Sequence, residues 1–134
     1  MTVELFFLSV DEVIEVHEAV AEASGGSKGI RDRGLLESAV NMPTTTFGGV
    51  LLHDGLAAMA AAYLYHLCQN HPFFDGNKRV GVTCAEVFLT LNRAELDASD
   101  DELERFTMAV ADGSLGKPEL TELFRRIVND SGRA

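Results

Sequence analysis

Residues 71–79 read His71-Pro72-Phe73-Phe74-Asp75-Gly76-Asn77-Lys78-Arg79, and they lie between two runs of helical character, residues 56–70 and residues 78–91. Both runs are apolar on nearly every face, and a helix of that composition is buried. The polar stretch therefore joins two core helices. A rigid frame that holds a polar loop is where catalytic groups are usually placed.

The residue types in this stretch suit a phosphate group. A loop that leads into a helix presents unpaired main-chain N–H groups and the positive end of the helix dipole. Lys78 and Arg79 add positive charge at the N-terminus of the helix, which normally favours acidic residues. The two cations therefore lower the stability of the helix unless a bound anion offsets their charge. Gly76 lets the main chain approach an anion, because it has no Cβ. Asp75 offers a hard oxygen to Mg²⁺, and the imidazole of His71 suits proton removal from a hydroxyl group.

Several of these residues also have a plain structural interpretation. His71 can act as a hydrogen-bonding residue at a helix end, and Asp75 or Asn77 can cap the helix that follows. Phe73 is expected to be an anchor in the core, and Pro72 stiffens the turn.

The stretch resembles the signature loop of the Fic/Doc superfamily, His-x-Phe-x-Asp/Glu-Gly-Asn-Gly/Lys-Arg. Residues 29–39 and residues 45–49 also resemble the segments that precede this loop in death-on-curing (Doc) toxins. The resemblance covers most of the chain. It implies one Fic/Doc domain over residues 1–134.

The resemblance also implies roles for individual residues. His71 is expected to be the general base, and Asp75 the ligand of the Mg²⁺ that bridges the phosphates of ATP. The residues expected to bind the nucleotide phosphates are Gly76, Asn77, Lys78 and Arg79. A flap is expected to pair with the main chain of a target protein, a mode of binding that tolerates varied targets. The flap residues are Thr45, Thr46, Phe47 and Gly48.

Two positions separate this chain from the AMP-transferring members of the superfamily. Those members usually carry Gly where this chain has Lys78, and a second Arg where it has Val82. The resemblance therefore implies a Doc-type kinase that moves the γ-phosphate of ATP to a hydroxyl group of a translation factor of the elongation factor Tu class, which stops translation. The alternatives are an AMP transferase acting on a protein hydroxyl, and a catalytically silent binding module.

Many members of the superfamily restrain themselves with a Ser/Thr-x-x-x-Glu motif. In this chain no Ser or Thr has Glu four residues later; Ser9, for example, meets Val13, and Ser99 meets Leu103. The resemblance therefore implies a cognate antitoxin that acts in trans.

Composition bounds the remaining possibilities. The 134 residues are 46% apolar, which indicates one folded domain, and no apolar run reaches the ~20 residues of a membrane span. The start of the chain lacks the basic region of a signal peptide, so we expect a cytoplasmic protein. Eleven basic residues against 21 acidic ones give a net charge of −10, which disfavours direct binding to nucleic acid. Cys68 and Cys84 are expected to be reduced and buried.

The periodicity predicts an all-α bundle of about six helices with a small β-like flap before the third. Ser9 with Glu12 and Ser99 with Glu102 form capping boxes for the first and fifth helices. Asp32 is expected to cap the second helix, and Asp54 the third. Pro118 opens the last helix, which is expected to run through residue 128.

The other histidines give weaker signals. His17 and His53 are expected at the surface or at the edge of the core. His66 lies within a predicted helix and has no acidic partner at zinc spacing, so no metal site is expected there.

Overall fold

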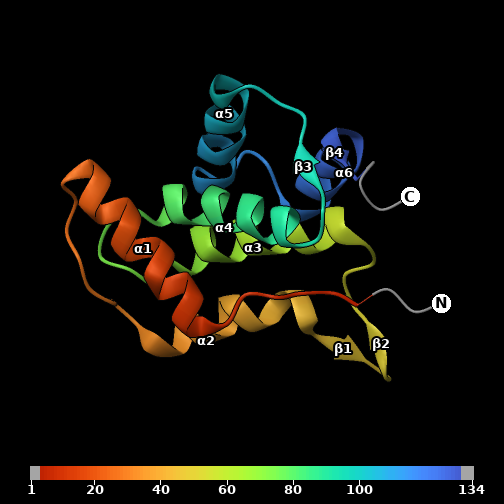
Figure 1. Cartoon of the computed structure of the whole chain (residues 1–134), viewed down its shortest axis with the longest axis horizontal. Coiled ribbons are helices and arrows are strands. Elements are labelled where there is room, and N and C mark those ends of the chain that lie inside the picture. Colours follow the sequence, from red (N-terminus) through yellow and green to blue (C-terminus); the bar gives the residue numbers. More distant parts are fainter. Residues whose placement is uncertain (1–3, 131–134) are drawn as a thin grey trace.

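The computed structural model describes residues 4–130, and these residues form a bundle of six α-helices with two small two-stranded sheets. The elements in chain order are α1 (Val10–Ser24), α2 (Arg33–Asn41), the 3₁₀ turn η1 (Met42–Thr44), β1 (Thr46–Phe47), β2 (Val50–Leu51), α3 (Leu56–Asn70), α4 (Asn77–Leu91), β3 (Glu95–Leu96), α5 (Asp100–Ala111), α6 (Lys117–Ile127) and β4 (Val128–Asn129). Figure 1 shows α3 and α4 side by side through the middle, with α2 and α5 on opposite sides of the pair. The expected all-α architecture is therefore confirmed.

Of the four expected N-caps, three are confirmed and one is wrong, and Pro118 opens the last helix as expected. Ser9 and Ser99 form complete capping boxes with Glu12 and Glu102, and the side chain of Asp32 accepts the N–H of Leu35. The exception is α3, for which Gly55 and not Asp54 is the N-cap. The chain enters α3 through Gly55 at φ 90°, a conformation that glycine adopts readily, and no side chain caps this end.

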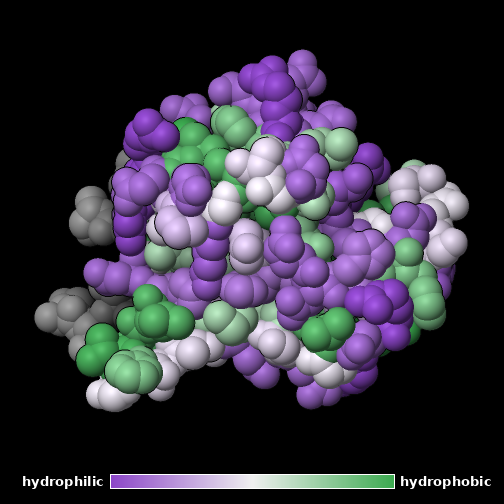
Figure 2. Space-filling view, turned by 180° about the vertical axis from the view of Figure 1, so that it is seen from behind, coloured by the Kyte–Doolittle hydropathy of each residue, from purple (hydrophilic) through white to green (hydrophobic). Residues whose placement is uncertain are grey.

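The flap lies between η1 and α3, as expected. β1 and β2 pair antiparallel, with Thr46 opposite Leu51 and Phe47 opposite Val50. Gly48 and Gly49 form the turn with positive φ at both positions, which matches the right-handed twist of a two-residue hairpin. Phe47 is 83% exposed, and with Val50 it makes the flap a green protrusion at the lower left of Figure 2.

A second pair of strands was not expected. β3 and β4 pair antiparallel, with Glu95 opposite Asn129 and Leu96 opposite Val128. Val128 therefore belongs to a strand and not to the last helix. This pairing joins the segment after α4 to the end of α6, so it depends on residues more than 30 positions apart.

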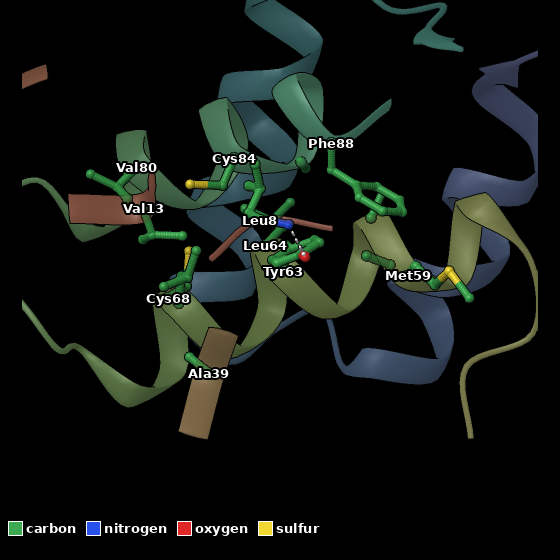
Figure 3. Packing of buried hydrophobic residues seen from close by; sticks show 14 of the residues in the cluster. Leu8, Val13, Ala39, Met59, Tyr63, Leu64, Cys68, Val80, Cys84 and Phe88 are labelled. Carbon is green, nitrogen blue, oxygen red and sulfur yellow. Dashed lines mark hydrogen bonds between the residues drawn. The ribbon is translucent and has the colours of Figure 1, made fainter. Parts of the chain in front are cut away.

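The core is built mainly between α3 and α4. Tyr63 of α3 packs against Phe88 of α4 with ring centroids 5.2 Å apart, and the dashed line in Figure 3 marks the N–H of Leu8 donating to the hydroxyl of Tyr63 at 2.9 Å. The helices approach closely at Gly81, where an added Cβ would lie 3.1 Å from Leu64 Cδ1 and 3.2 Å from its carbonyl oxygen. The pair is thus a tightly packed frame for the loop that joins it.

Cys68 and Cys84 are free and buried, as expected. Burial raises the pKa of each thiol to about 12. His17 and His53 are also buried, so the expectation of a surface or edge position is wrong for both. No helix among residues 4–130 has the length and apolar character that crossing a membrane requires.

Candidate active site

The loop between α3 and α4 is held in shape by two special main-chain positions and one anchor. His71 ends α3 in the left-handed conformation, at φ 49° and ψ 53°, and its side chain is exposed. Gly76 has φ 82° and is the N-cap of α4. Between them Phe73 is fully buried, as expected, and its ring stacks on the imidazole of His17 at 3.9 Å with an interplanar angle of 4°. The buried stack explains why His17 of α1 is not at the surface.

Asn77 closes the loop from the first position of α4. Its side-chain oxygen accepts the N–H of Phe73, and its side-chain amide donates to the carbonyl of Phe73, both at 2.9 Å. The residue is only 5% exposed. Both polar ends of the side chain are therefore engaged within the loop. The group that Asn77 can offer to a phosphate is its main-chain N–H, which lacks an intrahelical partner at a helix start.

Asp75 is held by main-chain donors from two segments. Oδ1 accepts the N–H of Gly76 at 2.9 Å, and Oδ2 accepts the N–H of Ser27 at 3.2 Å. The carbonyl of Asp75 lies 3.0 Å from Nε2 of His17, and since a carbonyl can only accept, Nε2 carries the proton. Gly26 leaves room for this carboxylate, because a Cβ at position 26 would lie 2.8 Å from Oδ2 of Asp75. The alternative interpretation of Asp75 or Asn77 as the N-cap of α4 is wrong for both, since that cap is Gly76 and no side chain caps the helix.

The first turn of α4 carries two exposed cations, Lys78 and Arg79. It contains no acidic residue, and no side chain caps it. The ion pairs among the described residues are Arg33 with Glu37 and Arg125 with Glu122, so neither Lys78 nor Arg79 belongs to one. Positive charge from side chains, free N–H groups and the helix dipole therefore coincide at one point.

These groups surround one open cleft of about 1040 Å³. The expected site residues that line it are His71, Asp75, Gly76, Asn77, Lys78 and Arg79. The remaining walls come from α1, α3, the rest of α4 and α5, and they include Val20, Cys68, Val82 and Leu103. This volume is at the upper end of the range for small-molecule sites, and it suits a nucleotide.

The end of the cleft away from the loop is acidic. Glu86 of α4 and Asp100 and Glu104 of α5 line it. Burial, and secondly the nearby carboxylate of Asp100, raises the pKa of Glu86 above its ordinary value. The cleft therefore runs from a cationic end at the loop to an anionic end, so an anionic ligand is directed to the loop.

The expected flap residues do not line this cleft. Thr46 and Phe47 form β1, Gly48 begins the turn, and the carbonyl of Thr45 accepts the N–H of Leu52 at 2.9 Å. The flap is a separate exposed feature between η1 and α3, so the structure brings together the loop residues but not the flap residues.

Four supporting residues escaped the sequence analysis: His17, Gly26, Ser27 and Arg31. They contact the loop from 40 to 58 positions earlier in the chain. No local pattern gives them a contact with the loop, although Gly25-Gly26 signals the end of α1 and Arg31 lies in the segment 29–39 that resembles Doc toxins. Gly26 is needed because Asp75 approaches it closely, and no sequence pattern predicts this approach.

The residues present fit a nucleotide bound with Mg²⁺. Each carboxylate oxygen of Asp75 uses one lone pair on an N–H group and keeps another for a cation. Mg²⁺ usually takes one or two carboxylates and completes its shell with phosphates and water. Residues 4–130 hold no cluster of three or more His, Cys, Asp or Glu arranged for a metal ion.

The fold and the cleft define a class: all-α proteins whose two central helices are joined by a loop suited to phosphate. The model of the Fic/DOC family matches residues 7–89, which is more than half of the chain, and the chain belongs to this family. The chain is similar to "Toxin Doc" of Mycolicibacterium smegmatis, with 41% identity over 91 residues that cover 68% of this chain and 69% of the relative. It is also similar to "Protein kinase doc" of Escherichia phage P1, with 28% identity over 120 residues that cover 90% of this chain and 94% of the relative. The Fic/Doc membership expected from residues 71–79 is thereby confirmed.

Proposed function

We propose that this protein is a toxin-type protein kinase that transfers the γ-phosphate of ATP to a hydroxyl group of a translation factor of the elongation factor Tu class. The observation that carries the proposal is one cleft that gathers an imidazole, a carboxylate, two cations and an uncapped helix N-terminus. The similarity to a relative named as a protein kinase over 90% of this chain supports the choice of γ-phosphoryl transfer.

The residues of the loop divide the work of this reaction. The hydroxyl oxygen of the target attacks the γ-phosphorus, the bond from this phosphorus to the bridging oxygen breaks, and ADP leaves. His71 takes the proton of the hydroxyl group. Lys78, Arg79 and the N–H groups at the start of α4 balance the charge on the phosphate oxygens. Bound Mg²⁺ would supply further charge neutralisation, and Asp75 is the residue that would hold it.

The site of action is the cytoplasm, where translation occurs. The flap binds the target protein, whose main chain pairs with the exposed edge of β1 or β2. A cognate antitoxin restrains the enzyme in trans, because the chain contains no Ser/Thr-x-x-x-Glu motif of its own. Induction in a bacterial host should therefore stop growth for the wild type and not for His71→Ala. Equal growth of the two would contradict the toxin function.

The test of the reaction uses ATP labelled at either the α or the γ position. Wild type and His71→Ala are each incubated with Mg²⁺, labelled ATP and purified elongation factor Tu, and in parallel with a bacterial lysate. Label transferred from the γ position by the wild type alone supports the kinase. Transfer only of the α label would establish AMP transfer and overturn the kinase proposal. Absence of transfer in every arm would favour a silent binding module.

A further inference from the structure

The main chain that carries His71 lies at the C-terminal end of α3, where the last carbonyl groups of a helix lack intrahelical partners. His71 adopts the left-handed conformation, which costs an L-residue about 1–2 kcal/mol. Within residues 4–130 its exposed imidazole makes no hydrogen bond. The main chain of this turn therefore sets the direction of the Cα–Cβ bond of His71, so whatever fixes the turn limits where the ring can lie.

Arg31, from the connection between α1 and α2, binds this turn. Its Nε donates to the carbonyl of His71 at 2.6 Å, and its Nη2 donates to the carbonyl of Asn70 at 3.0 Å. The main-chain N–H groups of Arg31 and Asp32 both donate to the carbonyl of Pro72, at 2.7 and 3.0 Å. Four donors from two adjacent residues thus take three consecutive carbonyl groups.

The chemistry of these contacts calls for arginine. The carbonyl groups at a helix C-terminus carry partial negative charge, so a fixed positive charge is favourable there. The planar guanidinium group presents Nε and Nη2 in a fixed geometry and can hold two carbonyl groups together, which a single ammonium group does less well. Arg33, two residues later, has a different environment, because its partner within the described part of the chain is Glu37 on the exposed face of α2.

We infer that Arg31 is a positioning residue for His71: it holds the main chain of residues 70–72 so that the imidazole faces the cleft in a fixed place. This inference rests on the proposed function, in which His71 accepts the proton. A misplacement of about 1 Å in a catalytic group can cost about 100-fold in rate. Removal of the Arg31 side chain takes a charged donor from the carbonyl groups of His71 and Asn70, and because Arg31 is exposed, water can replace it there.

The experiment compares Arg31→Gln with Arg33→Gln, a matched loss of an exposed arginine from the same segment. For Arg31→Gln we expect kcat for γ-phosphoryl transfer to fall about 10- to 100-fold, with KM for ATP within about twofold of wild type. Arg31→Lys should recover part of the loss, and Arg33→Gln should match the wild type. A proportional loss in both glutamine variants, or unchanged kcat in Arg31→Gln, would overturn the inference.

A second measurement does not depend on activity. The chain has four histidines, so ¹³C-labelled histidine gives a simple NMR spectrum in which the His71 signal is identified by its loss in His71→Ala. In Arg31→Gln this signal should shift or broaden while the other three keep their positions. An unchanged His71 signal would refute the positioning role. If the wild type transfers no phosphate, the proposed function fails, and the NMR spectra still decide the role of Arg31.

Discussion

Replacement of Asn77 by alanine removes both hydrogen bonds that close the signature loop. The main-chain N–H and carbonyl of Phe73 would lose their partners, and Phe73 is fully buried. An unsatisfied buried polar group costs about 1–3 kcal/mol, so the two together cost about 3 kcal/mol even if water reaches one of them. For a chain of this size each kcal/mol lowers Tm by about 3–5 °C, which gives a decrease of about 10 °C.

Thermal unfolding followed by far-ultraviolet circular dichroism measures this change, and ATP affinity is measured in parallel well below Tm. Asn41→Ala is the control, since Asn41 is exposed at the end of α2 and its loss should leave Tm within about 2 °C of wild type. The reasoning would be refuted if Asn77→Ala kept the wild-type Tm and lost ATP affinity. In that case the side chain would bind phosphate and not close the loop.

Three further changes test other parts of the structure. Gly26→Ala places a methyl group 2.8 Å from Oδ2 of Asp75, so the Mg²⁺ concentration for half-maximal transfer should rise about tenfold, and an unchanged requirement would contradict the metal role of this carboxylate. Tyr63→Phe leaves the buried N–H of Leu8 without a partner and should lower the free energy of unfolding in urea by about 1–3 kcal/mol; a loss under about 0.5 kcal/mol would contradict the hydrogen bond. Burial, and secondly a neighbouring lysine, lowers the pKa of His66 from 6.5 to about 4, so the unfolded chain takes up a proton between these values that the folded chain does not. The free energy of unfolding should therefore fall from pH 6.5 to pH 4, less steeply in His66→Asn, and equal slopes in urea titrations would contradict the shift.

The sequence predicted features that depend on neighbouring residues. The capping boxes at Ser9 and Ser99 need only residues three positions apart, and the loop groups that line the cleft all lie within residues 71–79. The capping boxes and the loop residues can therefore be predicted from a few neighbouring positions in the sequence. The N-cap of α3 was misplaced by one residue, because the aspartate before Gly55 satisfies the usual preference while the main-chain conformation requires glycine.

Features that depend on distant residues were not predictable in this way. The pairing of β3 with β4 joins Leu96 to Val128, and neither short strand has an alternating pattern of its own. The support of the loop by His17, Ser27 and Arg31 spans 40 to 58 positions. Each of these contacts uses a main-chain group on at least one side, so no pair of matching residue types in the sequence marks it.

The burial of Cys68 in α3 and Cys84 in α4 gives the native protein an internal kinetic probe. A thiol reacts as its thiolate, and a pKa of about 12 leaves almost none at neutral pH while the helices stay packed. Cys84 is fully buried, so its alkylation reports the opening of the two helices around the loop, whereas Cys68, which is 7% exposed and lines the cleft, also reports access through the cleft. They are the only two cysteines of the chain, so no background thiol has to be removed. A ligand that binds the loop should slow both reactions, whereas one that binds the flap should leave them unchanged.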